Sequence, residues 1–190
     1  MLLTFLMIVP LADSFAQQPT FIKSGTIEYE RKQNIVAAFN NDPHMQVFVD
    51  KSGSDIYTSN FTLTINDNQS LYQFSKNNGP LNRFAEMPAD DNIVYSDLSN
   101  EKKIAQKNVI GQLYTIAELD TIKIQWKLTD ERKTIAGIDC RRANALMYDS
   151  IYVVDFFSEQ FLPAIGPESF AGLPGLILGV SIPHEHISWF

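Results

Sequence analysis

The sequence predicts a mainly β (α+β) fold, a curved antiparallel sheet with one or two short helices, because polar and apolar residues alternate in several short segments. In Thr26–Arg31, Ile27 and Tyr29 fall on one face and two glutamates on the other. Phe61–Ile65 alternates in the same way, and Ile122–Leu128 matches a period of two at every position. Short turns between successive segments favour antiparallel meanders.

The remaining elements follow from the same pattern. A short helix is predicted around Ile35–Phe39, and Leu71–Ser75 returns from a turn at Asn66–Asn68 as the second strand of a hairpin. Residues 76–91 have little periodicity and predict a long surface loop. The second half adds five short strands, at Ile93–Leu98, Lys102–Asn108, Gln112–Leu119, Ile138–Tyr148 and Ser150–Phe157. The alternation of Ile138–Tyr148 is imperfect, which predicts a bulge.

A proline- and glycine-rich stretch, Gly166–Leu178, interrupts this series of strands. We expect Pro167 to open a short helical turn that Gly172 ends in the left-handed conformation. Pro174 and Gly175 predict a type II turn, in which the proline fixes φ and the glycine supplies a positive φ. The aliphatic residues that follow predict a buried strand.

Part of the Gly166–Leu178 stretch resembles the sequence motif of a known protein family. Gly172–Ile177 spell Gly-Leu-Pro-Gly-Leu-Ile, which resembles the motif of the GLPGLI family, exported proteins found mainly in Bacteroidetes. With its upstream elements the resemblance covers residues 126–180. The resemblance implies an exported cell-envelope protein of a family without an assigned activity, and it supplies no catalytic residues. The residues that carry it are Gly172, Leu173, Pro174, Gly175, Leu176, Ile177, Cys140, Ala143, Gly166 and Pro167.

The two ends of the chain predict export and truncation. Residues 1–16 resemble a signal peptide, with an apolar run at Leu2–Ala12 and a small-x-small cleavage site at Ser14–Ala16. Residues 17–190 are then a single domain with no transmembrane segment, located in the periplasm or secreted; no cysteine follows the apolar run to accept a lipid anchor. The chain stops inside a strand that begins at Glu185, so we expect C-terminal strands to be missing.

Charge and cysteine content exclude some partners and leave others open. A net charge of −7 argues against nucleic acid, since nothing here neutralises a phosphate track. Cys140 is the only cysteine, so the domain has no internal disulfide. It is either a small buried apolar residue or a reactive or metal-ligating thiol.

A histidine pair gives a metal-binding hypothesis. On a strand, His184 and His186 would present both imidazoles on one face, which suits one Zn or Cu ion. Cys140, or His44 with Met45, would complete the ligands, and their softness favours copper. Without such partners the two histidines are surface residues, and no cofactor is implied.

Asp155 shares a strand face with the apolar Ile151, Val153 and Phe157. If it is buried without a partner, its pKa rises and it becomes a functional candidate. The competing interpretations are that this face meets water or that Arg142 pairs with the carboxylate. No Gly-x-Ser-x-Gly turn, catalytic triad or phosphate loop accompanies it, so no enzymatic activity is predicted.

The sequence therefore favours a periplasmic binding or chaperone-like module for an apolar ligand or for an envelope partner such as an outer-membrane protein. By its strand pattern the sheet resembles the half-barrel of lipoprotein-carrier domains, with aromatic and aliphatic residues on its concave face. The alternative is a Cu- or Zn-binding envelope protein that uses the His184-x-His186 pair.

Overall fold

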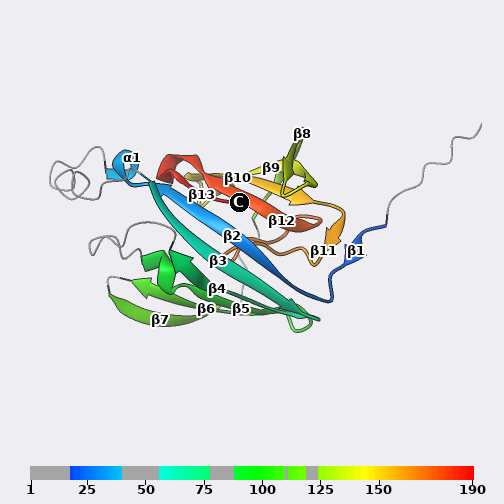
Figure 1. The fold of residues 1–190 in the computed structure, drawn as a ribbon, viewed down its shortest axis with the longest axis horizontal. Coiled ribbons are helices and arrows are strands. Elements are labelled where there is room, and N and C mark those ends of the chain that lie inside the picture. The colour runs from blue at the N-terminus through cyan, green and yellow to red at the C-terminus, as the bar shows by residue number, and fades with distance from the viewer. Residues whose placement is uncertain (1–17, 40–55, 78–87, 110, 119–123) are drawn as a thin grey trace, which may run out of the picture.

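The computed structural model describes residues 18–39, 56–77, 88–109, 111–118 and 124–190, and its main feature is one large antiparallel sheet (Figure 1). The strand order is β7-β6-β5-β4-β3-β2-β13-β12-β10-β9-β8. These strands are β2 (Ser24–Asn34), β3 (Ile56–Asn66), β4 (Gln69–Asn77), β5 (Ile93–Asp97), β6 (Lys102–Val109), β7 (Gln112–Glu118), β8 (Lys127–Ile135), β9 (Ile138–Met147), β10 (Ile151–Ser158), β12 (Leu176–Ile182) and β13 (Ile187–Trp189). The predicted fold class, a mainly β protein built on a curved antiparallel sheet, is confirmed.

Short elements complete the fold. β1 (Thr20–Phe21) pairs in parallel with β11 (Phe161–Leu162). The helical pieces among the described residues are α1 (Ile35–Phe39) and two 3-10 turns, η1 (Pro88–Asp91) and η2 (Pro183–Glu185). No helix in the described ranges is long and apolar enough to cross a membrane.

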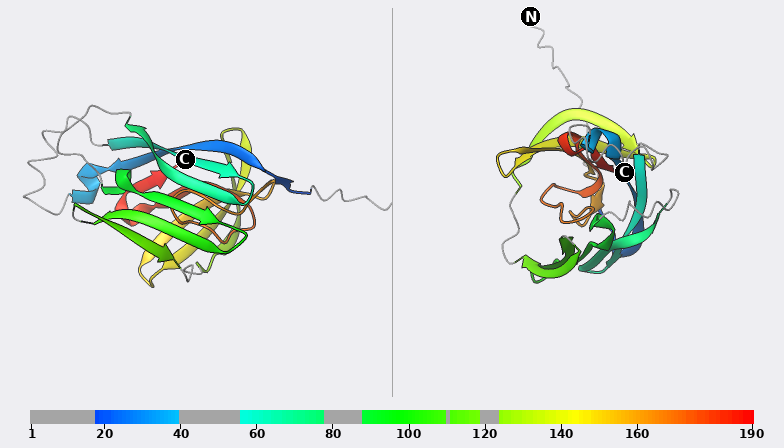
Figure 2. Two further views of the ribbon diagram at one scale, coloured as in Figure 1. Left: turned by 90° about the horizontal axis from the view of Figure 1, so that it is seen from below. Right: turned by 90° about the vertical axis from the view of Figure 1, so that its left-hand side faces the viewer.

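The sheet is open and curls around a piece of its own chain. Its edge strands are β7 and β8, and no ladder joins them within the described part of the chain. Residues 163–175, which connect β11 to β12, lie inside the curl (Figure 2, right). We call residues 163–175 the inner segment. In the core, the hydroxyl of Tyr29 on β2 donates a 2.6 Å hydrogen bond to the carbonyl of Ile177 on β12.

The core lies on the concave face. Successive strands β3 to β6 place Leu63, Tyr72, Val94 and Ala105 directly opposite one another, and all four are buried. Residues in register on an antiparallel sheet share a face, so this row lines one side of the hollow. The ring of Phe61 stacks on Tyr72 at a centroid distance of 5.1 Å.

Most hairpins form where the alternation predicts them, but the strand predicted at Ile122–Leu128 is wrong over residues 124–126. Residues 124–126 belong to no strand, and β8 begins at Lys127. The reason is a long-range contact: the indole nitrogen of Trp126 donates a 2.9 Å hydrogen bond to the carbonyl of Ala171 on the inner segment. The predicted bulge is not within β9 but opposite it, where β8 shifts register between Leu128 and Arg132.

Several expectations fall outside the described residues. These are the signal peptide at residues 1–16, most of the loop predicted at residues 76–91, and His44 with Met45. The two ends of that loop are described: residues 76–77 extend β4, and residues 88–91 form η1.

Candidate functional site

The inner segment carries the Gly-Leu-Pro-Gly part of the motif, and its two motif glycines serve different purposes. Gly172 has a φ of 89°, the left-handed conformation that the sequence predicted. The positive φ predicted for Gly175 is wrong, because that residue is absent from the left-handed region. Instead its N–H donates to the carbonyl of Leu173 at 2.8 Å, closing a three-residue turn around Pro174.

Gly175 is needed for close approach rather than for its φ. A Cβ atom on it would lie 2.1 Å from the carbonyl oxygen of Ser158. A Cβ on Gly166 would likewise lie 2.6 Å from the Cβ of Ile177. The motif glycines therefore let the inner segment pack directly against β10 and β12.

Pro167 opens a turn, but not the helical turn that was predicted. The N–H of Phe170 donates to the carbonyl of Pro167 at 3.1 Å, which makes a four-residue turn. Within it Glu168 has a φ of 53°, unusual for a residue with a side chain. This backbone conformation holds the Glu168 side chain inside the hollow of the sheet.

The carboxylate of Glu168 ties the inner segment to the opposite wall. The side-chain amide of Asn92 donates to its two oxygens at 3.2 and 3.0 Å, and the ammonium of Lys107 lies 3.8 Å from one of them. Burial raises the pKa of Glu168, while Lys107 and the amide hydrogen bond oppose that rise.

Two adjoining cavities flank the turn at residues 168–170. The first, of about 450 Å³, lies between the inner segment and strands β3 to β6, and its walls include Leu63, Tyr72, Val94 and Phe170. The second, of about 360 Å³, lies toward β2 and β13. Both share five lining residues, namely Lys103, Ile124, Glu168, Ser169 and Phe170.

Arg31 lines the second cavity, and its guanidinium has fewer hydrogen-bond partners within the described ranges than a buried guanidinium normally has. The residue is 4% exposed, and its Nη2 donates to Gln33 at 2.9 Å. Its Nε and Nη1 find no hydrogen-bond partner among the described residues. The guanidinium carbon lies 5.5 Å from the ring centroid of Trp189, a cation–π contact. Burial lowers the pKa of Arg31, and the nearby carboxyl groups of Glu168 and Asp90 oppose that shift.

Aromatic rings line the side of this cavity next to Arg31. Phe170 meets the Trp189 ring edge-on at a centroid distance of 6.3 Å. The Tyr72 hydroxyl lies near the Trp189 indole, which partly offsets the rise that burial gives to the pKa of Tyr72. Neither the Tyr72 hydroxyl nor the Trp189 indole nitrogen has a partner with hydrogen-bond geometry among the described residues.

Asp155 is buried in the core rather than placed in a cavity. It is 0% exposed, neither carboxyl oxygen has a hydrogen-bond partner among the described residues, and burial raises its pKa well above the ordinary value. Its cross-strand neighbours are Val180 and Ala143. The side chain of Arg142 pairs with Glu131 instead. Asp155 is thus buried without a partner in the described part of the chain, but it lines neither of the two cavities.

The predicted metal ligands are not brought together. His184 lies in η2 and His186 follows it with a φ of 54°, so the expectation that both sit on one strand face is wrong. Both are exposed, whereas Cys140 is fully buried, and burial raises the pKa of its thiol to about 11. No group of three His, Cys, Asp or Glu side chains suited to a metal ion occurs in the described part of the chain.

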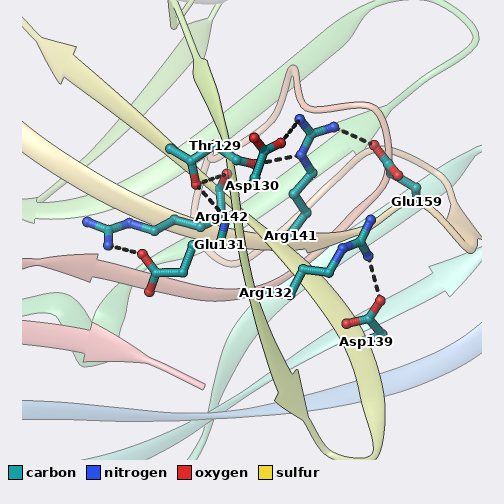
Figure 3. Close-up of polar contacts among 8 residues, drawn as sticks. All are labelled: Thr129, Asp130, Glu131, Arg132, Asp139, Arg141, Arg142 and Glu159. Atoms are coloured by element: carbon teal, nitrogen blue, oxygen red, sulfur yellow. Dashed lines mark hydrogen bonds and ion pairs between the residues drawn. The ribbon is translucent and has the colours of Figure 1, made fainter.

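A second charged group, which we call the edge cluster, lies on β8, β9 and the end of β10 (Figure 3). The Nε of Arg141 donates to the Thr129 carbonyl at 2.7 Å, and its guanidinium lies 3.4 Å from Asp130 and 3.5 Å from Glu159. Arg132 pairs with Asp139, and Arg142 with Glu131. These acids are about half or more exposed, so each pair contributes on the order of 0–1 kcal/mol.

Comparison with known proteins gives a fold likeness only. No protein-family model matches the chain, and no curated protein does. Among solved structures it is similar to PNGF-II in a C2 crystal form, with a TM-score of 0.56 and 14% identity over 86% of this chain and 26% of that one. The P21 form gives a TM-score of 0.57 and 15% identity over 88% of this chain and 27% of that one. The chain thus spans about a quarter of PNGF-II.

Sequence reasoning missed Arg31, although a signal was present. Arg31 follows Ile27 and Tyr29 at a period of two, so the alternation places it on their buried face. A charged residue on the apolar face of a strand is a candidate functional residue, and this holds for Arg31 as it does for Asp155. Glu168 gave no such signal, because its position depends on the fold of the inner segment.

Proposed function

We propose that this protein is an exported cell-envelope binding module of the GLPGLI family, which holds an apolar ligand in the hollow of its curved sheet. The observation that carries the proposal is the pair of adjoining cavities, of about 450 and 360 Å³, on either side of residues 168–170. Small-molecule sites are concave, mostly apolar and of about 300–1,000 Å³. Export and family membership rest on residues 1–16 and on the motif at residues 172–177.

The open edge of the sheet supports the same proposal. The buried row of Leu63, Tyr72, Val94 and Ala105 continues onto β7 as Ile116, which is 44% exposed. Leu113 and Tyr114 of β7 are also exposed, and they lie on opposite faces of the strand. An apolar surface that runs from the core to an exposed edge is typical of a binding site or an entry route. A chaperone-like role would use the same edge to contact an envelope partner.

A dye-binding assay tests the proposal. The neutral apolar dye N-phenyl-1-naphthylamine should become fluorescent on binding the wild-type protein with saturable affinity. Ala164→Phe adds a ring to a residue that lines the first cavity and should weaken dye binding at least about tenfold, equivalent to about 1.4 kcal/mol. The control is Thr134→Phe, on an exposed position of β8 opposite Asp139, and it should leave binding unchanged. Saturable binding that is equal in all three proteins would overturn the proposal, as would an absence of binding.

A further inference from the structure

We propose that the ligand ends in a carboxylate and that Arg31 binds it in the second cavity, which makes the ligand class a long-chain carboxylic acid. This inference rests on the proposed function, since it names the ligand of the same hollow. It starts from Arg31, whose Nε and Nη1 have no hydrogen-bond partner among the described residues although the side chain is 4% exposed. Buried polar groups are nearly always hydrogen-bonded, so these two donors indicate a missing acceptor.

The charge of the second cavity favours an anion. Its described lining residues include three cations, Arg31, Lys103 and Lys107, and one carboxylate, Glu168, a net formal charge of +2. The whole chain has a net charge of −7, so this cavity has the opposite sign. The carboxylate of Glu168 is held by Asn92 and Lys107, and it forms no ion pair with Arg31 within the described residues.

The same environment favours a carboxylate over a more highly charged group. A guanidinium binds a planar carboxylate well, and a charge-assisted hydrogen bond of this kind is roughly twice as strong as a neutral one. The carboxyl groups of Glu168 and Asp90 both oppose the lowering of the Arg31 pKa, so they lie close enough to repel a dianion more strongly than a monoanion. A single negative charge therefore fits the site.

The surroundings of Arg31 fit the apolar part of such a molecule. The Trp189 ring lies next to the guanidinium, and Phe170 and Ile187 line the same cavity. Because Phe170 and Ile124 also line the first cavity, an alkyl chain that starts at Arg31 has apolar wall on both sides of the inner segment. A carboxylate head at Arg31 and an alkyl tail in the first cavity would occupy the hollow together.

The test is displacement of N-phenyl-1-naphthylamine by palmitate and by 1-hexadecanol, which share chain length but not charge. Wild-type protein should bind palmitate at least about tenfold more tightly than the alcohol. Arg31→Gln should lose this preference, and Arg31→Lys, which keeps the charge and is the check against misfolding, should retain part of it. Arg132→Gln, an exposed control in the edge cluster, should behave as wild type.

The outcomes separate this inference from the proposed function. If the dye binds but palmitate and the alcohol compete equally, or if Arg31→Gln keeps the preference, the carboxylate assignment is overturned and the binding function stands. If 1-palmitoyl lysophosphatidic acid competes better than palmitate by tenfold or more, the head group is a phosphate and the assignment is likewise wrong. If the dye itself does not bind, the proposed function fails first.

Discussion

The charged residues of the edge cluster and those around the inner segment differ in their exposure and in their pairing. In the edge cluster each arginine meets an acid, the acids are about half or more exposed, and water screens what remains. Around the inner segment, Arg31 and Glu168 are buried, and two guanidinium nitrogens have no acceptor among the described residues. Exposed and paired charges cost a fold little, whereas a buried, half-satisfied cation lowers stability. That difference supports our proposal that the Arg31 guanidinium serves binding.

The largest effect should come from the glycine that lets the inner segment approach β10. In Gly175→Ala the new Cβ would overlap the Ser158 carbonyl, which must move, so we expect the free energy of unfolding to fall by about 3 kcal/mol or more. The matched control is Gly137→Ala in the β8–β9 turn, where a Cβ meets nothing within 4 Å and only the φ of 81° opposes it, a cost of about 1–2 kcal/mol. Urea unfolding measures both, and equal costs would contradict the packing described here.

The next effect is a pH dependence from Asp155. Its pKa is raised in the folded protein, so between the ordinary value of about 3.9 and the raised value the unfolded chain loses a proton that the folded chain keeps. Stability therefore falls as pH rises through that interval, by up to about 1.4 kcal/mol per pH unit. Asp155→Asn should remove this slope and gain stability relative to wild type from pH 4 to pH 7.

Asp90 and Glu168 also have raised pKa values, but wild type and Asp155→Asn both contain them. The difference between the pH profiles of unfolding free energy of these two proteins therefore reports on Asp155 alone. Chemical denaturation at several pH values gives these profiles. Parallel curves for wild type and Asp155→Asn would show that Asp155 is ionised in the folded state, contrary to its burial without a partner.

The edge cluster should respond weakly. Glu131→Gln removes the acid that pairs with Arg142, but its side chain is 54% exposed, so unfolding should change by less than about 1 kcal/mol. Raising the salt concentration should shrink even that difference. A loss of 2 kcal/mol or more by thermal or urea unfolding would mean that this cluster supports the fold as strongly as the inner segment does.

The smallest effect is expected at the histidines. His184 and His186 are exposed, and no third ligand joins them among the described residues, so His186→Ala should not change the amount of copper or zinc that copurifies. Elemental analysis of the wild type and of His186→Ala measures the copper and zinc content per chain. One metal ion per chain in the wild type and none in the variant would instead support the alternative of a metal-binding envelope protein.

The sequence was sufficient to predict those features that depend on residues close together in the chain. Alternation placed the hairpins of β3 with β4 and of β9 with β10, and it identified Asp155 as a carboxylate on an apolar face. The left-handed φ of Gly172 was also predictable, because a glycine after a short turn commonly takes it.

The sequence was insufficient to predict those features that depend on contacts between residues far apart in the chain. Trp126 leaves the predicted strand because Ala171 accepts its indole hydrogen bond, and Gly175 is required by the Ser158 carbonyl. The contact of Arg31 with Trp189 needs β2 and β13 to be neighbours in the sheet, an order that local patterning does not specify. The candidate site lies where such long-range contacts concentrate.

Binding of an apolar chain in the hollow around the inner segment can be measured directly, because the sequence has two tryptophans. In Trp126→Phe, Trp189 is the single remaining tryptophan, and it lines the second cavity. Titration with a brominated palmitate should quench its fluorescence along a saturable curve with one molecule per chain. Quenching that stays linear, at the level given by free tryptophan in the same solution, would contradict binding in the hollow.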